Sequence, residues 1–451
     1  MPPQPSRILI AATVALIVAV AALLASVGAD ARWLAALGHV IMERGSVPAG
    51  VPFAADPTSQ WPNALVLAEL AFNGLEQTLG DRGLMLAQLI ALVVALTVLA
   101  RDSVAGGAGP VGTCAALLLV GVGALPSLAI ARVQLFSLIL LPVVIALLRA
   151  QARRPSRQIW LVVPLLALWS NLHGAALVGL AVVLAYLLLA RARQQPLLSL
   201  CVGASAIAAL CLTPVLLDTV SYYRGVLTNV AAQRGQGQWG PLSLGAPLDD
   251  VMIIAAVALG FSAVRARPAL WELAVILGLA AMTVNAGRSG VWLLFVLLAP
   301  AGRTINPHRT WQGLAPVAAV VSVTLIAFAV VRGPVAQGPS RALLAQALAL
   351  AHGTPVLAGD GIDEQVALAG GMIVAGNPID AFSRPDQALY LDWMAGTPAG
   401  RGELTAQVRV ALVERGSPSQ RLMQATPGYV DSGGDRTTEL FERGSRGVRE
   451  F

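Results

Sequence analysis

Residues 159–190 read IWLVVPLLALWSNLHGAALVGLAVVLAYLLLA, in which the polar segment WSNLHG at residues 169–174 separates two apolar stretches. Apolar stretches of this kind are typical of helices in a lipid bilayer. The amide of Asn171 and the imidazole of His173 then need hydrogen-bond partners from protein or water, because the hydrocarbon offers none. Polar groups at membrane depth mark a cavity, a pathway or a functional site.

The composition of the whole chain is that of a membrane protein. Hydrophobic residues make up 56% of the 451 residues and charged residues only 12%, which excludes an ordinary soluble domain. The formal net charge of +6 comes from arginine alone, because the chain contains no lysine. The arginines cluster in short links between apolar stretches, which indicates membrane topology rather than nucleic-acid binding. The cysteines lie in apolar stretches, so we expect buried thiols and no disulfide.

About eleven apolar stretches are candidate membrane spans. Several are shorter than about 17 residues, so we expect tilted, broken or re-entrant helices. The first could be read as a cleaved signal peptide, but its length of about 20 residues favours an uncleaved helix. The stretches are Ile8–Gly28, Gly83–Ala100, Val111–Ala131, Gln134–Leu148, Ile159–Ser170, Ala175–Ala190, Leu197–Leu217, Val251–Val264, Leu270–Val284, Gly290–Leu298 and Gly313–Val331.

Arginine placement predicts the orientation of the chain. With a cytoplasmic N-terminus, the links on the cytoplasmic side carry more arginines than those on the outer side, as the positive-inside rule requires. The outer side then holds two long loops, 29–82 and 218–250, together with the WSNLHG segment and the C-terminal residues. We therefore expect a multi-pass protein of the plasma (inner) membrane of a bacterium.

The composition changes near Arg332, and residues 333–451 are polar and rich in Gly, Pro and Asp. Alternating helices and strands predict a small α/β domain of about 100 residues there. Residues 432–436, SGGDR, are interpreted as a turn and not as a phosphate loop, because the spacing of glycines and lysine in such loops is missing. The predicted helices are Ser340–His352, Asp363–Leu368 and Arg384–Met394, and the predicted strands are Thr354–Ala358, Met372–Ala375 and Val408–Val413.

Asp30 directly follows the first span. It precedes the stretch Ala31–Arg44, which is amphipathic enough to lie along the membrane interface with Trp33 as an anchor. An aspartate here can cap this helix through its first free N–H groups. It can also act as a general base on an incoming hydroxyl group at the membrane surface. The residues alone leave both interpretations open.

The order of these features resembles the GT-C superfamily of integral-membrane glycosyltransferases. Asp30 and Trp33 form an Asp-x-x-Trp start, and Gly45–Pro48 forms a Gly-x-x-Pro turn, as in a bacterial subgroup. Asn377–Phe382 is similar to the segment where such proteins carry an Asp-Gly-Arg-x-x-x-Tyr pattern, but it lacks that glycine and arginine. Five further segments between this turn and Asn377 resemble landmarks of the subgroup in the same order, namely Pro52–Pro57, Trp61–Asn63, Leu67–Glu69, Arg132–Ser137 and Trp169–Gly174.

The resemblance implies a donor sugar linked to polyprenyl phosphate and an acidic catalytic residue in the first outer loop. Asp30 is then the candidate base, with Asp56 in reserve. Glu69 is a further candidate for substrate binding, although its position on an apolar helix also suits a salt bridge to an arginine.

The candidates for binding the donor are cationic, polar and aromatic. Arg132 and Arg288 suit the donor phosphate because a planar guanidinium pairs with it through two hydrogen bonds, and the alternative for each is snorkelling to the interface. His173 and Asn171 then hydrogen-bond the phosphate or the sugar, or else they join helices inside the bundle. Trp239 suits a carbohydrate face, although tryptophan is also an ordinary interface residue.

No metal ligands are assigned, because the four histidines have no ligand spacing. Carboxylates in the acidic loops could still bind a divalent cation, which is the one cofactor that we consider.

We therefore expect an all-α polytopic transmembrane bundle of about eleven helices with a GT-C-like fold at 1–332, and a small extracytoplasmic α/β domain at 333–451. The expected function is transfer of a hexose or pentose from a polyprenyl-phosphate donor to a cell-wall glycan, a glycolipid or a protein, with the bilayer as a partner and no nucleic acid. Two alternatives stay open. One is a non-catalytic scaffold with a degenerate GT-C-like fold, and the other is a transporter or flippase, for which an internal repeat is missing.

Overall fold

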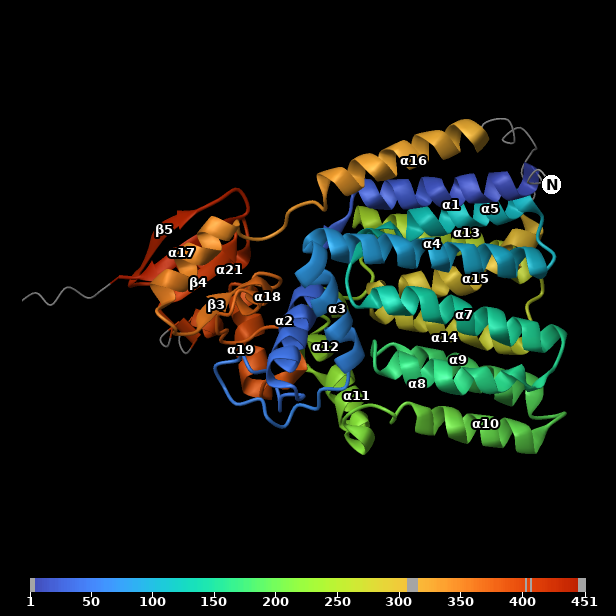
Figure 1. The fold of residues 1–451 in the computed structure, drawn as a ribbon, viewed down its shortest axis with the longest axis horizontal. Coiled ribbons are helices and arrows are strands. Elements are labelled where there is room, and N and C mark those ends of the chain that lie inside the picture. The colour runs from blue at the N-terminus through green and yellow to red at the C-terminus, as the bar shows by residue number, and fades with distance from the viewer. Residues whose placement is uncertain (1–4, 306–314, 402–403, 406–407, 445–451) are drawn as a thin grey trace, which may run out of the picture. The chain divides into compact units, whose positions relative to one another are not determined.

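The computed structural model describes residues 5–305, 315–401, 404–405 and 408–444. The chain forms two compact units, and each is assembled from separate parts of the sequence (Figure 1). The first unit contains residues 1–27, 79–216 and 235–335. The second contains residues 28–78, 217–234 and 336–451.

The first unit is a bundle whose long helices run roughly parallel to one another in Figure 1. A short parallel pair of strands, β1 with β2, lies at one end of α1 and α6. The elements are α1 (Pro5–Leu23), β1 (Ser26–Val27), α4 (Asp81–Ala105), α5 (Pro110–Gly123), α6 (Leu125–Ala129), β2 (Ile130–Ala131), α7 (Gln134–Arg153), η1 (Arg157–Leu161), α8 (Val162–Ser170), α9 (Ala176–Tyr186), η2 (Leu187–Arg191), α10 (Pro196–Ala209), η4 (Gly237–Trp239), α13 (Pro247–Arg265), α14 (Leu270–Asn285), η5 (Gly287–Ser289), α15 (Gly290–Thr304) and α16 (Ala315–Arg332).

The predicted apolar stretches coincide with helices of this unit. The stretch Val111–Ala131 is broken after Gly123 into α5 and α6, and residues 159–190 are broken between α8 and α9. Within the described residues, four helices are both long and apolar enough to cross a membrane, namely α4, α7, α13 and α16. The other apolar helices are shorter, so the number of spans stays a prediction. The start of the last stretch, residues 313–314, lies outside the described residues.

Helix α15 is the core of the first unit, because all its residues from Gly290 to Gly302 are buried. It packs against α4, α5, α13 and α14. The contact with α5 depends on a glycine: a Cβ added at Gly112 would collide with the backbone oxygen of Gly302. Small residues let helix backbones approach closely, as is usual in membrane bundles.

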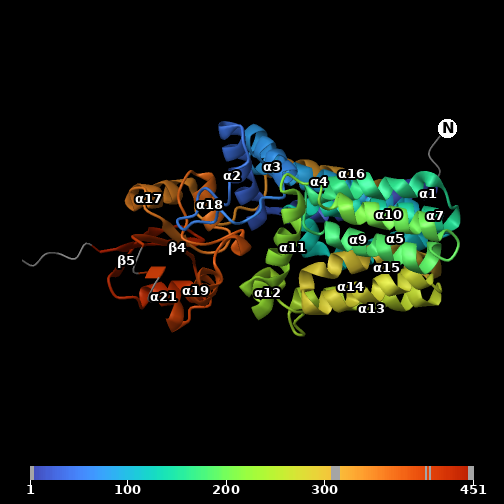
Figure 2. The same ribbon diagram turned by 90° about the horizontal axis from the view of Figure 1, so that it is seen from below.

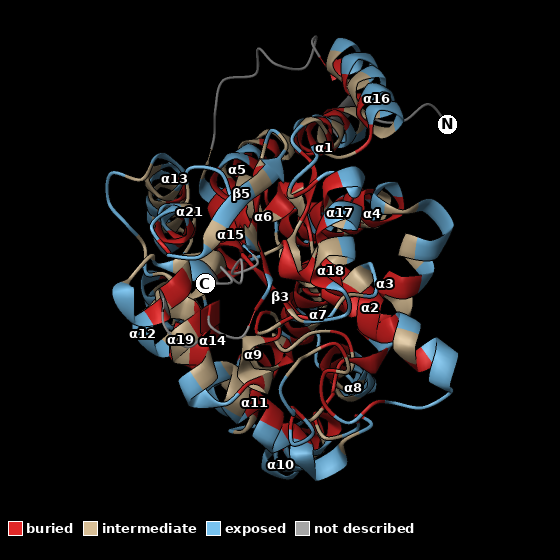
Figure 3. Cartoon of the chain, turned by 90° about the vertical axis from the view of Figure 1, so that its left-hand side faces the viewer, coloured by how far each residue is buried: buried red, intermediate tan, exposed pale blue. Residues whose placement is uncertain are grey.

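Other apolar helices leave most of their surface uncovered. Only 22% of the apolar window of α13 and 17% of that of α16 is buried inside the protein. Figure 2 shows α13 at the edge of the bundle, and Figure 3 shows exposed stretches along α16. Exposed valines on α16, such as Val317, Val320 and Val331, suit contact with lipid better than contact with water.

The second unit combines helices with a four-stranded sheet. The strand order is β3-β4-β6-β5, with β3 and β4 parallel and the other neighbours antiparallel. The elements are α2 (Ala29–Arg44), α3 (Val66–Leu79), η3 (Leu216–Asp218, where the chain enters this unit), α11 (Thr219–Thr228), α12 (Val230–Arg234), α17 (Arg341–Ala351), β3 (Val356–Ala358), α18 (Asp363–Leu368), η7 (Ile379–Ala381), α19 (Arg384–Met394), η8 (Pro398–Arg401), β4 (Val410–Glu414), α21 (Pro418–Gln424), β5 (Tyr429–Gly434) and β6 (Thr438–Arg443).

The predicted C-terminal helices are present as α17, α18 and α19, and two predicted strands are present as β3 and β4. The strand predicted at Met372–Ala375 is wrong, since only Ile373 forms bridges, to Val356 and to Ala54. Its backbone N–H donates to the oxygen of Phe53, so this apolar segment links the first outer loop to β3 instead of joining the sheet. The turn predicted at 432–436 is also shifted, because residues 432–434 belong to β5.

Most of the segment predicted as the first outer loop, residues 29–78, is folded into the second unit. Helix α2 packs against α18, and Gly38 lies so close to α3 that a Cβ there would collide with the backbone of Glu69. Trp33 is only 6% exposed and packs edge-on against Trp61. The interpretation of Trp33 as an anchor in the membrane interface is therefore wrong.

Candidate active site

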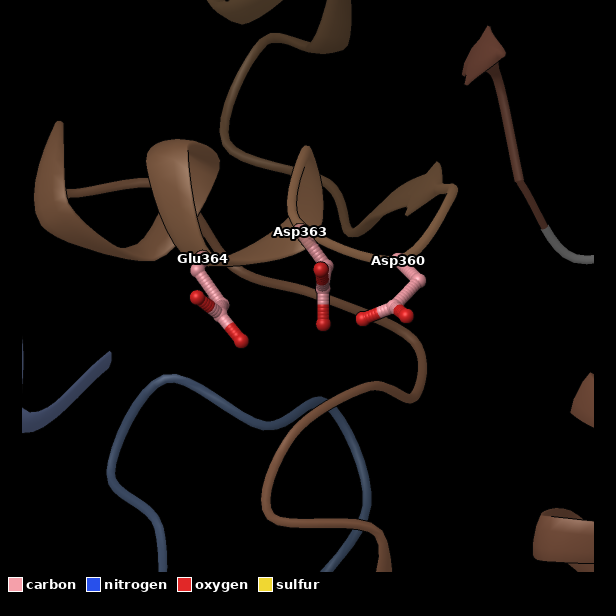
Figure 4. A group of neighbouring side chains, drawn as sticks. All are labelled: Asp360, Asp363 and Glu364. Atoms are coloured by element: carbon pink, nitrogen blue, oxygen red, sulfur yellow. The ribbon is translucent and has the colours of Figure 1, made fainter. Parts of the chain in front are cut away.

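Carboxylate groups gather in the second unit at the start of α18. Asp360, Asp363 and Glu364 each bring a carboxylate oxygen to within 4.8 Å of the others, and Figure 4 shows the three side chains pointing to the same side. Asp363 and Glu364 are 0% exposed, whereas Asp360 is exposed. The turn that brings the three together passes through Gly361, whose φ of 78° favours glycine.

Asn377 binds one oxygen of each of these carboxylates. Its backbone N–H donates to Oδ2 of Asp363 at 2.9 Å. Its Nδ2 donates to Oε1 of Glu364 at 2.7 Å and, over a longer distance of 3.4 Å, to Oδ1 of Asp360. The second oxygens, Oδ1 of Asp363 and Oε2 of Glu364, are buried and have no hydrogen-bond partner in the described part of the chain.

Burial raises the pKa of both Asp363 and Glu364 well above the usual range of carboxyl groups. Neighbouring negative charges raise it further, since Asp360 acts on Asp363, and Asp363 and Asp30 act on Glu364. The hydrogen bonds from Asn377 oppose both shifts. Several carboxyl groups that share a poorly solvated place are typical of functional sites.

Asp30, the candidate base, lies in the same unit as this cluster. It occupies the first turn of α2 and is half-buried. Besides burial, its charge raises the pKa of Glu364 and of Tyr222. The N-cap position of α2 is Gly28, so the interpretation of Asp30 as the N-cap residue is wrong. A negative charge in the first turn still interacts favourably with the helix dipole.

Two further acids surround Tyr222. Glu69 is 0% exposed and accepts a hydrogen bond from Nδ2 of Asn63 at 2.9 Å, and burial raises the pKa of Glu69 to about 8. Asp380 accepts a hydrogen bond from Nε1 of Trp61 at 2.8 Å, and burial raises the pKa of Asp380. Besides burial, the charges of Asp380 and Glu69 raise the pKa of Tyr222.

The other acidic predictions have different outcomes. Glu69 pairs with Asn63, so the salt bridge considered between Glu69 and an arginine is wrong; its Oε1 has no hydrogen-bond partner among the described residues. Asp56 is exposed, in the loop between α2 and α3.

The WSNLHG segment of the first unit forms the break between α8 and α9. Nε1 of Trp169 donates to Oγ of Ser137 on α7 at 2.6 Å, and the same Oγ lies 2.5 Å from Nδ1 of His173. An indole N–H only donates, so the serine accepts from Trp169 and donates to Nδ1 when the imidazole proton is on Nε2. His173 is half-buried, and its orientation is fixed by α7.

Asn171 has a clear role in packing. Its Nδ2 donates to the backbone oxygen of Ala167 at 2.8 Å and to that of Leu212 at 2.7 Å. Both amide hydrogens are therefore used to join the end of α8 to the segment that follows α10. This leaves the amide oxygen as the group that could meet a ligand.

Arg288 and Trp239 come together in the first unit. The guanidinium carbon of Arg288 lies 3.7 Å from the centre of the Trp239 ring, which is a close cation–π contact. Their backbones are also joined, because the N–H of Gly287 donates to the oxygen of Gly240 at 3.0 Å. Both side chains are half-buried. Two residues that were chosen separately from the sequence thus form one surface feature.

Arg132 is half-buried and lies between β2 and the start of α7, five residues before Ser137. The predicted residues therefore fall into two sets. Asp30, Asp56 and Glu69 belong to the second unit, and Arg132, Asn171, His173, Arg288 and Trp239 belong to the first.

Sequence reasoning missed the cluster of Asp360, Asp363 and Glu364. The pattern Asp-x-x-Asp-Glu at 360–364 is visible in the sequence. Acidic residues at the start of a helix are common, however, and the pattern does not reveal that two of these are buried. Sequence reasoning also missed the buried network around Arg149. Arg149 donates to Asp102 at 2.8 Å and to Glu272 at 2.7 Å.

The fold of the chain is similar to that of a solved protein, ArnT. The structure of ArnT from Cupriavidus metallidurans bound to undecaprenyl phosphate matches 98% of this chain and 99% of its own, with a TM-score of 0.52 and 12% sequence identity. Apo ArnT from the same organism matches 95% of this chain and 96% of its own, with a TM-score of 0.49 and 12% identity.

No family model and no curated protein sequence matches the chain. At 12% identity the likeness to ArnT is one of fold, and it extends over the membrane helices and the C-terminal part alike.

Proposed function

We propose that this protein is a membrane glycosyltransferase that moves a hexose or pentose from a polyprenyl-phosphate donor to an acceptor of the cell envelope. The observation that carries the proposal is the fold match over 98% of the chain to ArnT, a GT-C glycosyltransferase whose structure holds undecaprenyl phosphate. The acceptor is a cell-wall glycan, a glycolipid or a protein, each of which offers a nucleophilic hydroxyl or amine group.

The reaction needs one proton acceptor. The bond between the anomeric carbon and the phosphate oxygen breaks, the acceptor oxygen bonds to that carbon, and the acceptor proton must leave. Asp30 takes this proton, because it is a half-buried carboxylate at the start of α2 and its charge acts on Glu364 and Tyr222. The leaving group is polyprenyl phosphate, which departs with the electron pair of the broken bond.

Glu69 has another task. Burial raises the pKa of Glu69 to about 8, so it carries a proton at neutral pH and is a hydrogen-bond donor, not a base. Its Oε1, which has no partner among the described residues, is the atom available to a sugar hydroxyl. Asp56 is exposed and stays in reserve as a base.

The donor phosphate is bound by arginine. The ring of Trp239 lies against one face of the Arg288 guanidinium, and a planar guanidinium can pair with a phosphate through two parallel hydrogen bonds. Arg132, before α7, is the second candidate. His173, which Ser137 holds through Nδ1, is the candidate partner of the phosphate or the sugar. Asn171 offers its amide oxygen to a sugar hydroxyl.

The proposal includes an orientation. The first unit lies in the plasma (inner) membrane with a cytoplasmic N-terminus, and the C-terminal domain, residues 333–451, faces the outside. The arginine distribution supports this orientation. The apolar helices of the first unit and the polar sheet of the second fit such an arrangement.

The test uses the full-length protein in lipid nanodiscs with synthetic polyprenyl-phosphate sugars labelled in the sugar, and with an envelope extract as the acceptor. We expect transfer of label by the wild type, and a loss on the order of 10²-fold or more in Asp30→Asn, because general-base catalysis contributes that much.

Glu43→Gln is the matched control, since Glu43 lies on the same helix with its side chain 65% exposed. It should transfer at the wild-type rate. Equal rates in Asp30→Asn and the wild type would exclude Asp30 as the base. Absence of transfer from any hexose or pentose donor would exclude the transferase and favour a scaffold.

A further inference from the structure

The cluster at the start of α18 differs from an ordinary group of surface acids. Asp363 and Glu364 are 0% exposed, and the donor oxygens of the three residues lie within 4.8 Å of one another. Asp360 is exposed, so the cluster has one side open to solvent. Figure 4 shows that all three carboxylates point the same way.

The hydrogen bonds around the cluster leave specific oxygens unused. Asn377 occupies Oδ2 of Asp363 and Oε1 of Glu364. The remaining oxygen of each side chain is buried and has no hydrogen-bond partner among the residues that the structure describes. One asparagine therefore orients both carboxylates through one oxygen each and leaves the other oxygen of each without a partner in the described part of the chain.

When its carboxyl groups are ionised, such an arrangement needs a positive partner. A buried carboxylate without one is strongly unfavourable, and buried acids are normally paired with a cation or bound to a metal. Neither Asp363 nor Glu364 forms an ion pair within the described residues. The charge of Asp30 also acts on Glu364, which adds to the negative potential.

We propose that Asp360, Asp363 and Glu364 bind a divalent cation, with Asn377 as the positioning residue. The all-oxygen ligand set suits a hard cation such as Ca²⁺, Mn²⁺ or Mg²⁺ rather than Zn²⁺, which prefers nitrogen and sulfur. The exposed Asp360 gives the cation access from solvent, and water completes the coordination shell. The inference goes beyond the proposed transferase and does not depend on it.

A second feature fits this site. Gly376 lies against Asp363 so closely that a Cβ there would collide with the carboxylate. The backbone of the segment 376–377 is thus part of the wall that presents Asp363. Residues that hydrogen-bond to metal ligands hold those ligands in place. Loss of the Asn377 side chain should therefore weaken cation binding without removing a ligand.

The test measures Mn²⁺ and Ca²⁺ binding directly on the purified full-length protein after removal of metal with a chelator. Loss of the free Mn²⁺ signal in electron paramagnetic resonance gives the number of sites, and calorimetry gives the affinity for Ca²⁺. We expect one site per chain, binding that is at least about 10-fold weaker in Asn377→Ala, and no binding in the double variant Asp363→Asn, Glu364→Gln.

The controls separate binding from folding. Glu43→Gln should bind like the wild type, because this glutamate is exposed on α2. Asp360→Asn changes an exposed position, so this variant should fold normally but bind the cation more weakly. The wild type should also melt at a higher temperature when Mn²⁺ is added, because a ligand stabilises the state that binds it.

Two results would overturn the proposal. One is a wild-type protein that binds neither Mn²⁺ nor Ca²⁺ at about 1 mM, which is near the weak limit of protein calcium sites. The other is unchanged affinity in Asp360→Asn and in the double variant, which would place the cation elsewhere. Neither result bears on sugar transfer, which is measured separately.

Discussion

Glu69 shows what burial does to a single carboxyl group. It is 0% exposed, Asn63 is the one hydrogen-bond partner of its side chain among the described residues, and the pKa of Glu69 rises from 4.5 to about 8. The unfolded chain releases this proton near the ordinary pKa, whereas the folded chain keeps it until the pH approaches the raised pKa. Between these two values the unfolded state binds fewer protons than the folded state.

The stability of the folded protein should therefore fall as the pH rises from about 4.5 towards about 8, and level off above that range. Each unit of pKa difference corresponds to about 1.4 kcal/mol. Glu69→Gln removes the titration and keeps the shape of the side chain. Thermal unfolding of detergent-solubilised protein from pH 5 to pH 9 should show a flatter profile for the variant. Parallel profiles would contradict a raised pKa at Glu69.

The pair of Arg288 and Trp239 carries a second expectation. A cation–π contact of about 0.5–2 kcal/mol holds the guanidinium in place, and the ring lies 3.7 Å from its carbon. Trp239→Ala should raise the KM for the lipid-linked donor several-fold while kcat changes little, because donor binding is weakened and the base is untouched. Trp239→Phe keeps a ring and should lie closer to the wild type. A donor KM that is the same in all three proteins would exclude this role.

At the residue scale, the residue types can be read from the sequence, but the burial of their side chains cannot. Asp30 and the pair of Arg288 and Trp239 were selected by residue type and place in the chain. The roles of Asn377 and Asp380 were hidden, because they follow from partners far away in sequence, such as Trp61 for Asp380.

At the element scale, the first unit is joined by a buried ion network. Arg149 on α7 binds Asp102 on α4 at 2.8 Å, Glu272 on α14 at 2.7 Å and the backbone oxygen of Val296 on α15 at 2.8 Å. Arg149 is only 6% exposed, so all three bonds are shielded from water. One side chain thus connects four helices.

Removal of one partner should destabilise this bundle strongly. Glu272→Gln leaves part of the guanidinium charge unbalanced, and breaking a buried pair costs about 3–5 kcal/mol. Arg153→Gln is the control, because its side chain is 41% exposed and lies 3.7 Å from Asp102, and an exposed pair contributes at most about 1 kcal/mol. Melting temperatures in one detergent compare the two variants. An equal, small decrease in both would show that the network is not a stabilising element.

Elements with a strong local pattern could be predicted from the sequence. The apolar stretches became helices, and α19 has the predicted bounds Arg384–Met394, since Ser383 caps it and Pro385 lies in its first turn. The prediction of a strand at Met372–Ala375 is wrong because the backbone of this segment pairs with other parts of the chain at Ile373 alone. Ile373 pairs with the first outer loop and with β3, and neither contact is visible in a local pattern.

At the scale of the molecule, the second unit is built from three distant parts of the chain. Residues 28–78 and 217–234, which the sequence assigned to outer loops, group with the C-terminal residues in one compact unit. The candidate base, the buried glutamate and the α18 cluster all belong to it. The first of these segments is also held by contacts with residues more than 100 positions away, such as Trp61 with Asp380, and composition does not record such contacts.

The proposed orientation can be checked on the whole chain. Single cysteines at exposed positions of the second unit, such as Asp56 and Asp431, in a background without the three native cysteines, should react in intact cells with a reagent that does not cross the membrane. Arg154, in the link between α7 and η1, should react as cysteine only after the cells are opened. The reverse pattern would invert the topology and place Asp30 in the cytoplasm.

The central claim is that the chain cleaves the bond between a sugar and polyprenyl phosphate, and release of the lipid phosphate measures this without knowledge of the acceptor. Purified wild-type protein is incubated with polyprenyl-phosphate hexoses and pentoses labelled in the phosphate, together with envelope extract. The account predicts free labelled polyprenyl phosphate from at least one donor with the wild type and with Glu43→Gln, and a loss of the release in Asp30→Asn. No release from any donor, or equal release from Asp30→Asn, would contradict it.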